Sequence, residues 1–404
     1  MIGGPSGNAG FVNGFIANTG NGTTLPWQCP SNGLRISDSS NVTVQNLGVF
    51  NIYTRTSHSD LITWLGTFRD LSSFVCYANG GTGMSNVTFN NCLANDSYCG
   101  FFTQYEASSS TYRLENCTAY NCNWGGICGD YNSSSTLDVV TVRSCWFHDF
   151  SNWDSGSGNY HHDGFFAWAV SGGTLTTWNA YNNLIGPNFG TWTAGGLFAQ
   201  GWVANANVYN NILVGNASSY PDDGYIYINP YPDIVGQYNV FNNTVNGGGA
   251  GIGIYLGADP VGGHTTFVAQ NYVAQNNLIN NVGTPIARFQ ANSPSTTSAN
   301  YNLGYGLNPS LQYSYSTTNS SVFKTFSQWQ GLGFDANGSN GNPGLVGLGY
   351  PSSGGAAMGL GTNLYSSVQS DFFGYPCPAT GNWTAGAVQN PPCGTLTAST
   401  LDVI

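Results

Sequence analysis

Charged side chains are scarce in this sequence. Only 6% of the 404 residues are Asp, Glu, Lys or Arg, against about 25% in ordinary soluble domains. Seven Lys plus Arg stand against 18 Asp plus Glu, which gives a net charge of -11, and Lys324 is the single lysine. Nucleic acid and anionic membrane surfaces are bound by clusters of basic side chains, so we expect neither as a partner. Neutral glycans, and anionic glycans bridged by a cation, remain open.

The sequence also lacks long apolar runs and helical periodicity. No stretch of 18 apolar residues occurs, so we expect no membrane insertion. The opening segment, MIGGPSGNAG, has neither the basic nor the apolar region of a signal peptide, and we therefore expect a mature or trimmed form. With so few charges, solubility depends on the amide and hydroxyl groups of the plentiful Asn, Ser and Thr.

Cysteines and sequons indicate an oxidising compartment. The ten cysteines lack the paired spacing of a zinc site, and an even number in a charge-poor chain favours disulfides in a secreted or cell-surface protein. A soft-metal site at Cys117, Cys122 and Cys128 is the weaker alternative. About eleven Asn-x-Ser/Thr sequons fit an extracellular glycoprotein, and chance in an Asn- and Thr-rich chain explains them equally well. The cysteines are Cys29, Cys76, Cys92, Cys99, Cys117, Cys122, Cys128, Cys145, Cys377 and Cys393, and the sequons include Asn41, Asn86, Asn116, Asn216 and Asn382.

A repeated segment is the strongest feature of the sequence. Each copy has a polar residue, most often Asn, followed by two or three apolar residues, and copies recur about every 25 to 45 residues, the spacing of a solenoid. The flanking residues alternate between apolar and polar, as in SNVTVQN and SNVTFNN, which is the period of a strand with one buried face. The anchors of the repeat are Asn46, Asn91, Asn116, Ser144, Asn183, Asn211, Asn243 and Asn277.

A second strand follows the anchor in most copies. It opens with a glycine, which we expect at a bend, and continues with an apolar pair, which we expect in the core. Short strands cannot bury their faces alone, so the copies must stack about 4.8 Å apart with equivalent positions in columns. The sequence therefore predicts an all-β, right-handed parallel β-helix of roughly 8–11 coils. We expect the helix over residues 1–310 and a C-terminal coil and capping segment, packed on the helix, over residues 311–404.

The anchor columns are expected to be structural. Paired asparagines predict a ladder at a corner where the backbone is left-handed, a conformation that Asn tolerates. Cys92, Cys117 and Cys145 hold the same place after their anchors, so we expect an inward stack in which one pair bridges or all three pack. The other expected disulfides are Cys377 with Cys393 and Cys29 with Cys76.

The C-terminal part of the chain carries a family resemblance. It contains FSQWQGLGFDANGSNGNPGLVG (326–347) and SDFFGYPCPATGNWTAGAVQ (370–389). These segments, with the repeat, are similar to the secreted right-handed β-helix proteins of the pectate-lyase-like superfamily, in the bacterial group defined by parallel β-helix repeats. Trp383-Thr384 stands where that group has Trp-Asp, so a structural carboxylate is lost. The resemblance implies a fold and no single activity, because the superfamily includes lyases, hydrolases, epimerases, phage spikes and non-catalytic surface proteins.

The resemblance also implies a groove along the outside of one sheet. The stretch HHDGFFAW (161–168) ends the long insertion that contains Asp149 and Asp154, and it is echoed by HSD (58–60) and PDD (221–223). We expect an insertion of this kind to lie over a groove. The predicted catalytic residues are Asp163, His161, His162, Asp223 and Asp130, and the predicted substrate contacts are Trp168, Trp153, Gln200, Trp202 and Tyr225.

Three chemistries and one structural role are open for this stretch. Inverting hydrolysis needs two carboxyl groups roughly 6.5 to 9.5 Å apart, for which Asp163 pairs with Asp223 or Asp130. β-Elimination needs a base, here His161 or His162, and Ca²⁺ held by Asp163 and Asp223; no other cofactor is expected. Metal binding by both imidazoles is disfavoured because adjacent strand residues point to opposite faces. The structural alternative is a turn capped by an Asp before Gly.

Two functions follow from these observations. The leading hypothesis is an extracellular carbohydrate-active β-helix, a polysaccharide hydrolase or lyase. The alternative is a non-catalytic extracellular structural protein, such as an adhesin, fibre or filament subunit. Low charge favours the alternative, since little repulsion opposes self-assembly, whereas the clustering of His and Asp in the central insertion favours the enzyme.

Overall fold

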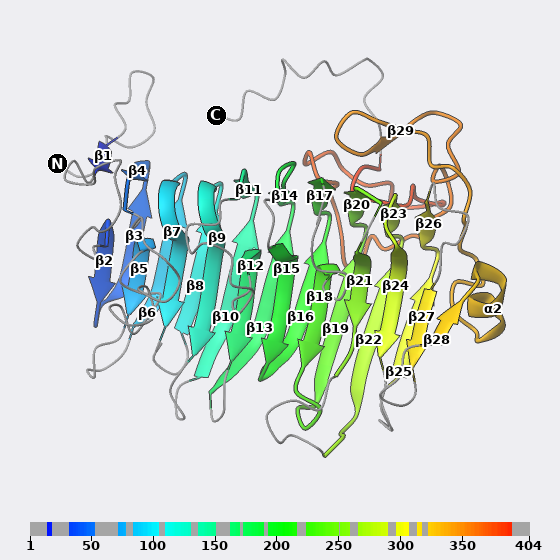
Figure 1. Ribbon diagram of the computed structural model, residues 1–404, viewed down its shortest axis with the longest axis horizontal. Coiled ribbons are helices and arrows are strands. Elements are labelled where there is room, and N and C mark those ends of the chain that lie inside the picture. The colour runs from blue at the N-terminus through cyan, green and yellow to red at the C-terminus, as the bar shows by residue number, and fades with distance from the viewer. Residues whose placement is uncertain are drawn as a thin grey trace.

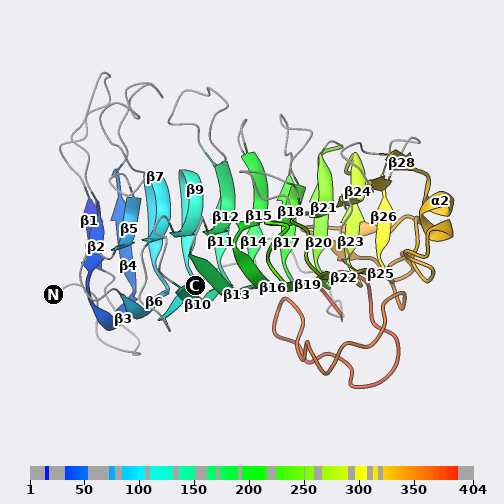
Figure 2. The same ribbon diagram turned by 90° about the horizontal axis from the view of Figure 1, so that it is seen from below.

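The computed structural model shows a parallel β-helix, which confirms the predicted fold class (Figure 1). Strands from successive coils lie side by side along the whole length of the molecule (Figures 1 and 2). No helix in the part of the chain described here is long and apolar enough to span a membrane. The structure describes residues 14–17, 32–52, 72–77, 84–104, 110–130, 136–150, 162–169, 173–189, 193–215, 224–249, 251–258, 266–289, 296–306, 313–316 and 322–389.

Each coil contributes up to three strands, and these form three faces. The first face is a nine-stranded parallel sheet: β3 (Ser40–Gln45), β6 (Ser85–Asn90), β8 (Ser110–Glu115), β10 (Thr136–Arg143), β13 (Thr174–Tyr181), β16 (Val203–Tyr209), β19 (Gly236–Phe241), β22 (Gln270–Gln275) and β25 (Thr296–Asn300). The second face holds short strands: β1 (Gly14–Ala17), β4 (Leu47–Phe50), the start of β7 (Leu93–Gln104), the start of β9 (Thr118–Asp130), β11 (Trp146–His148), β14 (Leu184–Ile185), β17 (Ile212–Gly215), β20 (Thr244–Gly247), β23 (Leu278–Asn280) and β26 (Leu303–Tyr305). The third face holds β2 (Leu34–Ser37), β5 (Ser72–Tyr77), the ends of β7 and β9, β12 (His162–Ala169), β15 (Thr193–Gly201), β18 (Gly224–Pro230), β21 (Ile252–Leu256), β24 (Thr284–Phe289) and β27 (Tyr313–Ser316).

A left-handed residue turns the chain from the first face to the second in each coil. In the paired asparagines it is the first Asn that takes this conformation, so the predicted anchors of four later coils are displaced by one residue. The second Asn points inward and begins the ladder. The left-handed residues are Asn46, Asn91, Asn116, Ser144, Asn182, Asn210, Asn242, Asn276 and Tyr301.

The inward asparagines form a hydrogen-bonded ladder along the helix axis, as predicted. In each step an amide NH₂ and a backbone N–H donate to the side-chain oxygen of the next coil, for example from Asn211 to Asn243 at 2.9 and 3.0 Å. The same NH₂ donates to a carbonyl of the preceding coil, as Asn243 Nδ2 does to Val208 O at 2.9 Å. All donors point the same way, so the last one needs a terminal acceptor. The ladder comprises Asn183, Asn211, Asn243, Asn277 and Asn302.

The buried carboxylate of Asp335 ends the ladder. It accepts from Asn302 N and Nδ2 at 3.1 and 2.8 Å and from Trp329 Nε1 at 2.9 Å. Burial raises its pKa to about 6, although these three hydrogen bonds act in the opposite direction. Trp329 lies in helix α2 (Phe326–Gly331), whose capping box at Thr325 fixes its start, so the helix and the ladder close the C-terminal end together.

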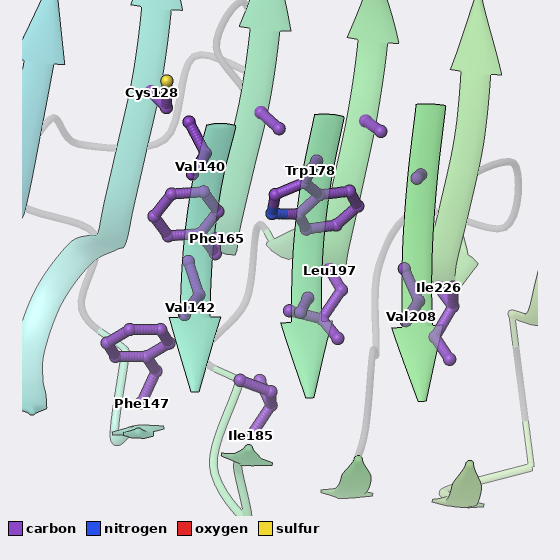
Figure 3. Packing of buried hydrophobic residues seen from close by; sticks show 14 of the residues in the cluster. Cys128, Val140, Val142, Phe147, Phe165, Trp178, Ile185, Leu197, Val208 and Ile226 are labelled. Atoms are coloured by element: carbon purple, nitrogen blue, oxygen red, sulfur yellow. The ribbon is translucent and has the colours of Figure 1, made fainter. Parts of the chain in front are cut away.

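Apolar side chains from all three faces fill the interior (Figure 3). Phe165 of the third face stacks against Trp178 of the first at a centroid distance of 6.3 Å. Glycine lets neighbouring coils approach closely at the start of the third face: a Cβ on Gly164 would lie 2.3 Å from Gly196 O in the next coil. Gly164 lies inside β12, so this predicted bend glycine serves close packing rather than a bend.

The segment after the last coil covers the second face. β28 (Val322–Lys324) pairs antiparallel with β27 and ends the parallel stacking, and a tail over residues 340–389, including β29 (Leu345–Val346) and β30 (Tyr350–Pro351), then folds back. Asn210 Nδ2 donates to Ser370 O at 2.6 Å, across 160 residues of sequence. Figures 1 and 2 show this orange and red tail beside the C-terminal coils alone. Thr384, where the related signature has Asp, is buried and donates its hydroxyl to Gln389 O.

We expect Asn243→Ala to lower the free energy of unfolding by about 3 kcal/mol, because two donors of Asn211 and the carbonyl of Val208 lose their buried partner. Asn239→Ala is the matched control, since Asn239 bonds outward to Asn207 on a partly exposed surface. It should cost less than about 1 kcal/mol. Equal losses in urea unfolding would contradict a special role for the inward ladder.

A second prediction concerns pH. The folded pKa of Asp335 is about 6 and its ordinary value is 3.8, so the folded state holds the proton more tightly. The stability from this group is present below about pH 4 and is lost as the pH rises through 6, a change of about 3 kcal/mol. Unfolding curves of the wild type and Asp335→Asn should differ by an amount that changes across this window. A constant difference would show that Asp335 does not titrate there.

Candidate functional site

The structure buries His162 and Asp163 of the predicted catalytic stretch. His162 and Asp163 begin β12 with exposed fractions of 2% and 0%. His162 Nε2 lies 3.3 Å from Asn123 Nδ2, and Asp163 packs against Gly195, where even a Cβ would lie 3.3 Å from Asp163 Oδ1. This packing fits the structural alternative better than an open catalytic cleft.

The predicted partners of this stretch are only partly brought together. Trp168 is in register with Gln200 on the third face, as expected, and Gln200 with Asn229. Asp130 is in register with Ala169 rather than Trp168, so it falls one residue away from the expected column. His161, Asp223, Trp153, Asp154 and the HSD triplet lie outside the described residues.

Two of the predicted substrate contacts have packing roles. Tyr225 is 1% exposed, belongs to the interior core and donates its hydroxyl to Gly215 O, which does not fit contact with a substrate. Trp202 is partly buried against the core and makes an edge contact with Tyr231 at 6.0 Å.

Part of the outward side of the third face is apolar. One outward column is buried and continues from coil to coil, with Phe198 and Tyr227 stacked at 4.5 Å and Tyr227 and Tyr255 at 4.1 Å. The column carries no ionisable group other than its tyrosines. Its members are Val75, Phe102, Ile127, Phe166, Phe198, Tyr227, Tyr255 and Ala287.

An open groove of about 600 Å³ lies instead on the second face. It runs over β1, β4, β7, β9 and β11, the coils that the tail leaves uncovered (Figure 1). Among the described residues its lining is aromatic and amide-rich and contains no Asp, Glu, Lys or Arg. The lining residues are Gly14, Phe15, Asn46, Leu47, Gly48, Phe50, Asn91, Cys92, Leu93, Thr118, Tyr120, Trp146 and His148.

Three rings and one amide follow the groove in a column that continues from coil to coil. Phe50, Asn95, Tyr120 and His148 are in register on four successive coils. The ring of His148 lies between two others, 5.2 Å from Tyr120 and 3.8 Å from Trp146. Burial, followed by the charge of Asp96, raises the pKa of Tyr120, so its hydroxyl stays protonated.

Two carboxylates stand at the rim of this groove. Asp149 is half exposed, and its Oδ2 lies 2.6 Å from His148 Nδ1. Asp96 accepts a hydrogen bond from Asn121 Nδ2. Asp96, Asn121 and Asp149 each come directly after a residue of this column, on three successive coils, and each has a left-handed backbone. Asp96 and Asp149 are therefore two coils apart, which is about 10 Å along the axis at about 4.8 Å per coil. Asp149 was predicted from the sequence only as part of an insertion, and Asp96, Tyr120 and His148 were not among the predicted site residues.

The expected cysteine stack lies beneath the groove. Cys92, Cys117 and Cys145 are buried in the column that continues as the Asn ladder, and Cys145 N donates to Asn183 Oδ1 at 3.0 Å. Cys117 Sγ donates to Phe89 O, a carbonyl of the preceding coil, in the way the asparagines do. The three cysteines pack as thiols.

Disulfides are not found among the described residues. Cys377 is a buried thiol, which does not fit the expected staple to Cys393, and Cys393 and Cys29 lie outside the described part of the chain. Within that part, no group of three or more His, Cys, Asp or Glu side chains is placed to hold a metal ion. Cys117, Cys122 and Cys128, the weaker soft-metal alternative, belong to that part of the chain and form no such group there.

Comparison with known protein families, with characterised proteins and with solved structures finds no match to this chain. The fold defines the class as a parallel β-helix solenoid. The likeness to secreted pectate-lyase-like proteins stays a prediction.

We expect Cys92 and Cys117 to resist iodoacetamide in the native protein at neutral pH. The neighbouring Cys117 thiol and burial raise the pKa of Cys92 well above its ordinary value, and burial does the same for Cys117, so little reactive thiolate is present. Mass spectrometry should find both cysteines alkylated only after unfolding without reductant. Disulfide-linked peptides containing either residue would contradict this arrangement.

Proposed function

We propose that the protein is an extracellular carbohydrate-binding β-helix and that a neutral polysaccharide lies along the second-face groove. The observation that carries this proposal is the column Phe50, Asn95, Tyr120 and His148, in which three of four successive coils carry a ring along a groove whose described lining has no Asp, Glu, Lys or Arg.

The chemistry of the lining supports a sugar ligand. Sugar rings have apolar faces that pack on aromatic side chains, while their hydroxyls need hydrogen-bonding groups at the edges. Asn46 and Asn91 supply amides on the groove wall, and the hydrogen bond from Asn91 Nδ2 to Asn46 Oδ1 at 2.7 Å fixes their orientation. A column that repeats with each coil suits a polymer running parallel to the helix axis.

The charge around the groove supports a neutral polymer. The carboxylates placed at the rim in the described part of the chain are Asp96 and Asp149, and the described lining has no Arg or Lys to balance an acidic sugar. A uronate chain would therefore meet charges of its own sign. This favours neutral chains over pectate-like ones.

Hydrolysis is a second candidate function. The two rim acids are about 10 Å apart along the axis, close to the roughly 6.5 to 9.5 Å between carboxyl groups in inverting glycosidases. Asp149, whose Oδ2 lies 2.6 Å from His148 Nδ1, and Asp96, which accepts from Asn121 Nδ2, are the two carboxyl groups that would share the roles of base and acid. Asp96→Asn and Asp149→Asn should each abolish release of reducing ends while leaving binding intact.

A polysaccharide panel tests the proposal. We expect linear glucan, mannan or xylan to retard the protein in affinity electrophoresis, and polygalacturonate to have no effect. Tyr120→Ala should weaken binding at least about tenfold, the loss of one stacking contact and its hydrogen bond. Tyr375→Ala is the control, because Tyr375 is 48% exposed on the tail, away from the groove. Binding that is unchanged in Tyr120→Ala would refute this site, and failure of every glycan would favour the structural alternative.

A further inference from the structure

One row of outward residues follows the second face through all its coils. It starts in the groove with Phe15 and passes through Trp146 at β11 to Leu184 at β14, and the later members lie beneath the tail. Leu184 is 6% exposed, and Ile212, Thr244, Leu278 and Leu303 are at most 1% exposed. The row is Phe15, Gly48, Leu93, Thr118, Trp146, Leu184, Ile212, Thr244, Leu278 and Leu303.

Trp146 marks the boundary between open and covered surface. It lines the groove on one side and on the other packs against the cluster formed by Leu184, Ile212 and the tail residues Tyr350 and Val388. Its Nε1 donates to Gly186 O at 2.9 Å, so the indole is fixed in this position. The groove and the tail therefore lie one after the other along the same face.

Buried contacts within the tail and to β20 hold the tail in place. Tyr350 stacks on Phe373 at 5.2 Å, and Ala387 N donates to Thr244 Oγ1 at 2.9 Å. The buried Asp371 accepts from the backbone N–H groups of Phe373 and Tyr375, each at 3.0 Å. A ligand that displaced this segment would lose these buried contacts.

We infer that the tail closes the groove at Trp146, so that the protein binds polysaccharide by a chain end. This rests on the proposed function of the groove. A polymer lying parallel to the axis over Tyr120 and His148 meets the tail at the next coil, so its terminal sugar lies against Trp146. A polysaccharide that continued along the face beyond Trp146 would overlap the tail, so a site in the middle of a long chain does not fit the groove.

The number of protein molecules bound per chain tests the inference. The probes are short, intermediate and long fractions of linear glucan, mannan and xylan, each mixed with excess wild-type protein and analysed by sedimentation velocity. We expect a constant number of bound molecules per chain, because every chain has the same number of ends. A number that rises in proportion to chain length overturns the inference and leaves the proposed function standing, whereas no binding to any fraction overturns both.

A tail variant gives an independent measurement. Tyr350→Ala removes the ring that stacks on Phe373 and opens the closed end, so binding to long fractions should rise at least about twofold per chain while short fractions are unaffected. Tyr365→Ala, 37% exposed on the same tail, is the control and should behave as wild type. Far-ultraviolet circular dichroism spectra of both variants are to be compared with that of the wild type, to check that each variant is folded. A folded Tyr350→Ala protein with wild-type stoichiometry on all fractions would count against closure by the tail.

Discussion

The inward ladder of side-chain amides is the interaction on which the rest of this structure depends. Each asparagine donates both to the coil behind it and to the coil ahead, so neighbouring coils cannot slip by a residue without leaving buried polar groups unmet. Where the ladder gives way to cysteines, the thiols of Cys92 and Cys117 donate to the same type of carbonyl in the preceding coil. The register fixed in this column also aligns the outward residues, which is why aromatic side chains from separate coils lie in one column along the groove.

The same stacking explains the scarcity of charge. Equivalent positions lie about 4.8 Å apart on successive coils, so a charged residue repeated in a column would face its own sign at each step, which is destabilising. Amides and rings have no such cost, and they form the columns seen here, including Asn179, Asn207 and Asn239 on the first face. A surface of this composition is suited to uncharged, hydroxyl-rich ligands.

Periodicity in the sequence predicted the β-helix, the Asn ladder and the cysteine stack, because each depends on neighbours at one coil's distance. The register in the paired asparagines was wrong by one residue, since either Asn of a pair fits a left-handed corner. Spacing from a glycine also misplaced Asp130, which follows a Gly-Gly pair and has two possible starting points. The burial of Asp163 and Tyr225 depends on packing that a local pattern does not reveal. The position of the open groove depends on where the tail ends, and contacts such as Asn210 to Ser370 leave no local signal.

The crystal structure of the protein with an oligosaccharide of the polysaccharide it binds tests the central claim most directly. The account predicts sugar rings over Phe50 and Tyr120 on the second face, with the terminal sugar against Trp146. Sugar bound on the third face, over Trp168 and Gln200, would contradict it and return the site to the column predicted from sequence.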